Sequence, residues 1–96
     1  MNTLIGNTFL LIAEYDTAYI PIEEIGEKFF NYSAAVSKRM AAKQGFPFPV
    51  FRNRSQKSQW LVSAEELAKW IDSQQEEAYS EWEALRKVRN ASRESI

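Results

Sequence analysis

Cysteine and histidine are both absent from this 96-residue chain. Without cysteine there is no disulfide framework and no thiolate metal site. Without histidine the chain also lacks the commonest metal ligand and the commonest general base. These two absences exclude most kinds of metal centre and catalytic site, so we predict a protein that is not an enzyme and that needs no cofactor.

Long hydrophobic runs are absent too. The most apolar stretch, residues 4–13, is interrupted by Gly6, Asn7 and Thr8, and no basic residue precedes it. This pattern fits neither a signal peptide nor a membrane span. We therefore expect a cytoplasmic protein with no membrane partner.

The chain is short but rich in apolar side chains. Its hydrophobic content is 45%, with three Trp, four Tyr and six Phe, which is enough to order a chain of this length. We expect one domain over residues 1–89 and a disordered tail over residues 90–96.

Acidic residues are missing from the middle of the chain. Residues 31–62 contain six Lys and Arg residues and no Asp or Glu, whereas residues 1–30 have a net charge of -4 and residues 63–96 a net charge of -3. Each phosphate that a basic residue neutralises releases counterions, and a nearby carboxylate would oppose that gain. The segregation predicts that residues 33–58 contact double-stranded DNA. A solvated charged face is the alternative, although such faces usually mix both signs.

Three short helices are predicted in the first half of the chain. The apolar segment 8–15 favours a helix packed on the core, and a second helix runs from Pro21 to Phe30 with its apolar residues at spacings of three and four. Ser33 is a good N-cap for a third helix, Ala34 to Gln44, which Gly45 stops. Two short helices joined by about three residues form a helix-turn-helix.

The third of these helices is the expected recognition helix. Val36 and Met40 should anchor it to the core, while small and basic residues on its other side let it approach a major groove closely. An ordinary alanine-rich surface helix is the alternative. The residues of this helix that we expect at the DNA are Ser33, Ala34, Ser37, Lys38, Arg39, Ala41 and Lys43.

A β-hairpin is predicted after the recognition helix. Residues 50–52 and 59–62 have the composition of strands, and residues 53–58 between them are polar, with two basic side chains. Such a tip suits phosphates and minor-groove edges. Phe46 and Phe48, just before the hairpin, should pack in the core. The hairpin residues that we expect at the DNA are Arg52, Arg54, Ser55, Gln56, Lys57 and Ser58.

A long C-terminal helix, about residues 63–89, begins with a capping box of Ser63 and Glu66. Leu67, Trp70 and Ile71 should close the core. A sparser stripe beyond them has heptad-like spacing, which favours pairing with a second copy; a helix folded back on its own domain is the alternative. The residues expected to hold a homodimer or a side-by-side assembly on DNA are Ile71, Ala78, Trp82 and Leu85.

The predicted fold is mainly α with a small β-hairpin (α+β): a winged helix-turn-helix with an extended C-terminal helix. The order of IPIEEIGEKFF, SAAVSKRMAAKQGFPFPV, a hairpin and SAEELAKWIDSQ resembles the MerR-like winged helix of phage excisionases and AlpA-type regulators. More specifically, NTFLLIAEYDTAYIPIEEI, the SQK at residues 55–57 and EELAKWID resemble the pyocin activator (PrtN) family, over roughly residues 7–75.

The resemblance implies a small bacterial or prophage regulator that binds promoter DNA and activates bacteriocin or phage-tail genes. An activator also needs a surface for RNA polymerase, for which the acidic residues 76–83 are a candidate. An excisionase that bends attachment-site DNA beside an integrase has the same expected shape. A third interpretation is a protein-interaction module, such as a phage antirepressor, whose basic segment meets an acidic protein.

Overall fold

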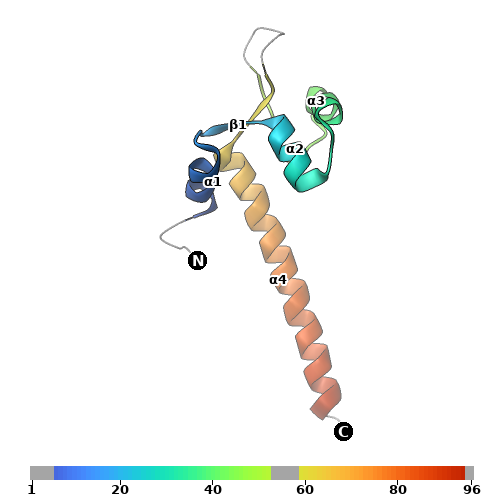
Figure 1. Cartoon of the computed structure of the whole chain (residues 1–96). Helices are drawn as coiled ribbons and strands as arrows, with labels where there is room; N and C mark the ends of the chain where they lie inside the picture. Colours follow the sequence, from blue (N-terminus) through green and yellow to red (C-terminus); the bar gives the residue numbers. More distant parts are fainter. Residues whose placement is uncertain (1–5, 53–58, 95–96) are drawn as a thin grey trace.

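The computed structural model describes residues 6–52 and 59–94. The elements follow in the order α1 (Asn7–Tyr15), β1 (Tyr19–Pro21), α2 (Ile22–Phe30), α3 (Ala34–Ala42), β2 (Leu61–Ser63) and α4 (Ala64–Glu94). Figure 1 shows α1 on one side of the first turns of α4, with α2 and α3 on the other. The prediction of a mainly helical chain with a small antiparallel sheet is therefore confirmed.

The first two helices end where short polar residues adopt a left-handed conformation. Asp16 follows α1 with φ 58°, and its N–H donates to the carbonyl of Ile12. Asn31 follows α2, also with φ 58°, and its N–H donates to the carbonyl of Gly26. Asp and Asn tolerate this conformation better than other non-glycine residues. Because α2 stops at Asn31, only three residues separate it from α3, as the sequence predicted.

The sheet joins two distant parts of the chain. β1 and β2 are antiparallel, with Ile20 opposite Val62 at the centre. On the other side of β2, Phe51 and Leu61 exchange two backbone hydrogen bonds, with N···O distances of 2.9 and 2.7 Å. The predicted pairing of residues 50–52 with 59–62 is thus present as one bridge. The longer pairing with β1 was not anticipated, because its central residues are more than forty positions apart in the chain.

The core collects aliphatic side chains from β1, α2, β2 and α4. Ile20, Ile22, Ile25, Val62 and Leu67 are all fully buried. Burying one such side chain stabilises the fold by about 1.5–3 kcal/mol relative to leaving it in water. These residues fix α2 and the first turns of α4 against the sheet.

An aromatic cluster extends the core toward α3. The ring of Phe30 stacks on Trp70 with centroids 5.2 Å apart, and Phe46 stacks on Phe48 at 5.5 Å. Both phenylalanines of the FPFP segment are buried, as predicted. The two prolines between and after them impose the extended path that brings both rings back to Phe30.

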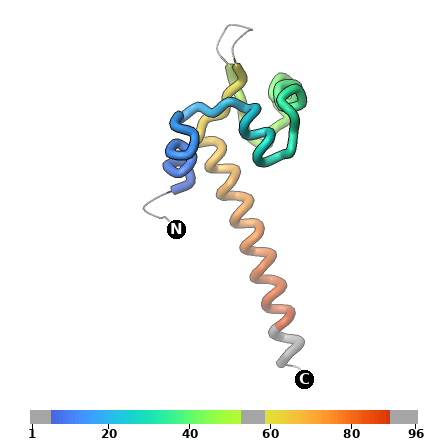
Figure 2. The backbone as a smooth tube through the Cα atoms, in the orientation of Figure 1, coloured from blue at the N-terminus to red at the C-terminus, as the bar shows by residue number. Residues whose placement is uncertain are grey.

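α4 belongs to the core only at its beginning. Ser63 Oγ accepts a hydrogen bond from the N–H of Glu66 at 3.0 Å, which confirms the predicted cap. Leu67 is buried, and Trp70 and Ile71 pack partly buried against the core, as expected. Every residue from 72 to 89 is exposed. Figure 2 shows this part of α4 leaving the rest of the chain as a single rod.

The end of α4 differs from expectation. The helix continues to Glu94, so the predicted disordered tail is wrong for residues 90–94. Ala, Arg and Glu are good helix formers, and neither Gly nor Pro stands there to stop the helix. None of the described helices has both the length and the apolar character that crossing a membrane would require.

Candidate nucleic-acid interface

The first turn of α3 is fixed by its cap. Ser33 Oγ accepts a hydrogen bond from the N–H of Val36 at 3.2 Å, so the predicted N-cap is confirmed. This bond satisfies one of the free N–H groups of the first turn. Ser33 therefore has a structural role that is independent of any ligand.

A clamp joins the end of α3 to the base of the hairpin. The helix ends at Ala42, and Gln44 takes a left-handed conformation with φ 53°. The Gln44 side-chain amide donates to the carbonyl of Val50 at 3.0 Å and accepts from the Val50 N–H at 3.3 Å. Because both ends of the amide are used, the intervening loop returns to α3 at a defined place, and the hairpin begins beside the helix.

The inward face of α3 is made of small residues. Ser37 and Ala41 are both fully buried. A Cβ atom added to Gly26 of α2 would lie 1.9 Å from Ser37 Oγ, so the two helices meet closely at this glycine. The prediction that Ser37 and Ala41 contact DNA is therefore wrong, because neither side chain is exposed. A glycine inside a helix was the signal that could have shown this close approach.

The outward face of α3 is basic. Val36 and Met40 are half-buried, and Met40 packs against the core, as predicted for it. The exposed residues are three cations and three alanines. They are Ala34, Ala35, Lys38, Arg39, Ala42 and Lys43. Two of the alanines, Ala35 and Ala42, were not among the residues predicted at the DNA.

Lys38 is the cation best defined on this face. Its side chain is 62% exposed, and its Nζ lies 3.9 Å from Oε2 of Glu23 in α2. A pair of this kind at the surface contributes only about 0–1 kcal/mol. Lys38 can therefore leave Glu23 for a phosphate or a base edge at little cost.

The base of the hairpin adds a fourth cation. The Arg52 guanidinium lies over the Trp60 ring, 4.6 Å from its centroid. This cation–π contact positions the Arg52 guanidinium at the surface beside Trp60. Across the sheet, Tyr19 and Phe51 meet edge to face at 5.8 Å. The remaining predicted hairpin contacts lie outside the described residues: Arg54, Ser55, Gln56, Lys57 and Ser58.

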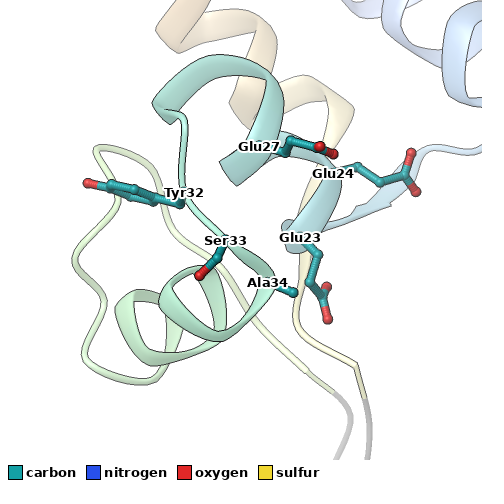
Figure 3. A pocket seen from close by; sticks show the side chains of 6 residues that line it. All are labelled: Glu23, Glu24, Glu27, Tyr32, Ser33 and Ala34. Carbon is teal, nitrogen blue, oxygen red and sulfur yellow. The ribbon is translucent and has the colours of Figure 1, made fainter.

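An acidic hollow lies at the start of α3. It has a volume of about 260 Å³, and Tyr32, Ser33 and Ala34 line it opposite three glutamates of α2, Glu23, Glu24 and Glu27. Figure 3 shows the Glu23 carboxylate beside Ala34. Within the described residues, no group of carboxylates is placed to hold a metal ion. The carboxylates oppose the binding of a phosphate at this helix end, which would otherwise favour anions.

The residues predicted for self-association divide into two kinds. Ile71 packs partly buried against the core of its own domain. Ala78, Trp82 and Leu85 are exposed on the projecting part of α4. Only the last three are therefore free of the core.

The exposed basic face of α3 lies within a part of the chain that matches a known family. The family model for pyocin activator protein PrtN matches residues 7–78. The chain belongs to the pyocin activator protein PrtN family. Neither the curated proteins nor the solved structures contain a match.

The boundaries of the match have a structural meaning. The part shared with the PrtN family begins at the first residue of α1 and ends inside α4, so it contains the whole core. The family places the chain among regulatory proteins of the phage or pyocin type. Residues 79–94 of α4 lie beyond the matched part.

Proposed function

We propose that this protein is a sequence-specific DNA-binding transcription activator of prophage or pyocin-type genes. In this proposal its fold is a winged helix-turn-helix, related to the MerR-like excisionase and AlpA-type regulators. α3 enters a major groove, and the hairpin after it lies along the neighbouring backbone. No bond is made or broken.

The outward face of α3 carries the proposal. Lys38 and Arg39 are exposed beside the small side chains of Ala35 and Ala42. Lys and Arg can donate to guanine, and alanine methyl groups can contact the thymine methyl while allowing the helix backbone to come close. The segment around this face, residues 31–62, contains no carboxylate.

The acidic hollow favours DNA contact along the side of α3 over contact at its N-terminus. Glu23, Glu24 and Glu27 lie beside the N-terminus of α3, so an approach of phosphates to that end is unfavourable. Farther along the helix, the segment that carries Lys38 and Arg39 contains no acidic residue, and the one carboxylate beside Lys38, that of Glu23, lies 3.9 Å from its Nζ. We therefore expect α3 to meet DNA along its length, with phosphates near Lys43 and Arg52.

A matched pair of charge reversals tests DNA binding. Lys38→Glu is compared with Lys69→Glu, which reverses an exposed lysine of α4, outside the basic segment. Binding to labelled duplex DNA, followed by fluorescence anisotropy, should weaken at least tenfold for Lys38→Glu and change little for Lys69→Glu. Equal binding by both variants would reject α3 as the interface and favour a protein-interaction module.

A promoter reporter tests activation separately. Expression of the protein should raise transcription from its target promoter, and Lys38→Glu should abolish the increase. DNA binding without any increase would leave the interface intact but reject the activator role. Excision of an integrated element in a parallel assay would then favour the excisionase function instead.

A further inference from the structure

The projecting part of α4, residues 72–89, is exposed to solvent along its whole length. Its exposed residues include four large apolar side chains: Tyr79, Trp82, Leu85 and Val88. A helix alone in water gains little stability from its backbone, because most helical stability in proteins comes from packing an apolar face. At the root of this part, the side-chain amide of Asn7 in α1 donates to the side chains of Asp72 and Gln75.

Charge is segregated along this helix. Residues 72–83 contain five acidic and no basic residues, whereas residues 84–89 contain three basic and no acidic residues. Trp82 and Leu85 lie at the boundary between the two blocks. Within the helix, Trp82 packs on the ring of Tyr79 at 5.5 Å and on the Arg86 guanidinium at 4.8 Å.

We propose that residues 78–89 pair with the same residues of a second copy, in antiparallel orientation, around Trp82 and Leu85. In this arrangement the acidic block of each copy lies beside the basic block of the other. A parallel pair in register would instead place acid against acid and base against base. Flanking charges set the orientation of paired helices in this way.

The heptad-like line of residues on this helix, its seam, supports a centre between Trp82 and Leu85. Gln75, Ala78, Trp82 and Leu85 follow alternating spacings of three and four, so they share one side of the helix. When the pair is centred between Trp82 and Leu85, Trp82 of each copy lies opposite Leu85 of the other. Trp82 and Leu85 lie beyond the residues that match the family, 7–78.

α1 offers additional apolar surface beside the seam. Through Asn7 it is joined to Asp72 and Gln75, at the root of the projecting helix. Its Phe9 and Leu10 are exposed.

The orientation can be measured by pulsed electron-electron double resonance. The chain contains no cysteine, so a single Lys69→Cys substitution gives one spin label per copy. At 1.5 Å per residue, antiparallel pairing separates the two labels by about 40–45 Å along the axis. A parallel pair keeps them within about 20 Å, given an interhelical distance of 8–10 Å. A short distance would overturn the antiparallel arrangement.

Sedimentation velocity tests the pairing itself. The protein should be dimeric at tens of micromolar, and Trp82→Glu should make it monomeric. Ser80→Glu, which places the same carboxylate on the opposite side of α4, should stay dimeric. A monomer at hundreds of micromolar in the unaltered protein, or equal association of the two variants, would reject the proposal.

The pairing does not rest on the proposed DNA-binding function. Trp82→Glu leaves α3 and the core untouched, so circular dichroism and binding to a short duplex report on the domain separately. Loss of the dimer with duplex binding retained is the expected result. The reciprocal result, in which Lys38→Glu loses duplex binding but remains dimeric, would show that pairing and DNA binding use different surfaces.

Discussion

Two leucines in α4 have opposite surroundings. Leu67 is fully buried in the core, whereas Leu85 is 64% exposed. The first part of the helix therefore holds the fold together, and the second part is available to a partner. A similar division runs around α3, where Ser37 and Ala41 are buried while Lys38 and Arg39 are exposed.

The largest expected effect is the difference between truncating Leu67 and truncating Leu85 to alanine. Leu67→Ala should lower the free energy of unfolding by about 2–5 kcal/mol, because it leaves a cavity in the core. Leu85→Ala should change it by less than about 0.5 kcal/mol at concentrations where the protein is monomeric. Urea denaturation followed by circular dichroism measures both. Equal losses would mean that the projecting helix is part of the folding unit.

The next effect concerns the contact between α2 and α3. Gly26→Ala should destabilise the protein by about 1–3 kcal/mol, because the new methyl group would lie 1.9 Å from Ser37 Oγ and 3.0 Å from Ser37 Cβ. At an uncrowded helix position the same substitution would stabilise.

A double-mutant cycle identifies the cause. Adding Ser37→Ala to Gly26→Ala removes the nearer atom and should restore part of the lost stability. Ser37→Ala alone should be neutral or stabilising, because the buried hydroxyl has no hydrogen-bond partner among the described residues. Stabilisation by Gly26→Ala alone would contradict the close packing of α3 on α2.

A smaller effect is expected at the cap of α3. Ser33→Ala should cost about 1 kcal/mol, because the N–H of Val36 loses its acceptor. Ser33→Asn, which can restore a cap acceptor without adding a negative charge beside the glutamates of the hollow, is the matched control and should recover most of the loss. Thermal unfolding by calorimetry measures the difference. An unchanged stability in Ser33→Ala would show that the cap does not hold the start of α3.

The smallest effect involves a lysine outside the basic segment. A hydrogen bond to Glu14 raises the pKa of Lys28, and the lysine also lies over the ring of Tyr15. A raised pKa means that this contact stabilises the fold at neutral pH and is lost as pH rises through the folded-state value. Both groups are about half exposed, so the effect is small.

The Lys28 effect appears as a difference between two proteins. The unaltered protein should lose slightly more stability than Glu14→Gln between pH 9 and pH 11.5, since only the former has the ion pair to lose. Identical pH profiles would show that the pair contributes nothing.

Much of the core could be predicted from the sequence. The caps at Ser33 and Ser63 and the burial of Leu67 follow from local patterns: hydroxyl side chains before helices and apolar residues at helical spacing. The FPFP segment was also placed correctly, because its prolines exclude a helix and its rings require cover.

The orientation of α3 could not be predicted in the same way. Alanine and serine carry almost no hydrophobic contrast, so a helix of nine residues that contains four alanines and one serine has no clear apolar face. Its burial is decided by Gly26 on another helix. The β1–β2 pairing was missed for a related reason, since Ile20 and Val62 meet across more than forty residues of chain.

Salt dependence of DNA binding tests the central claim most directly. Titrations against random duplex DNA by fluorescence anisotropy, at several salt concentrations, give the number of phosphates neutralised. If the six basic residues of segment 31–62 all contact phosphates, the slope of log affinity against log salt should approach about -5 per protomer. Lys38→Glu should make this slope shallower. An absence of binding even at low salt would contradict the account and assign the basic segment to a protein partner.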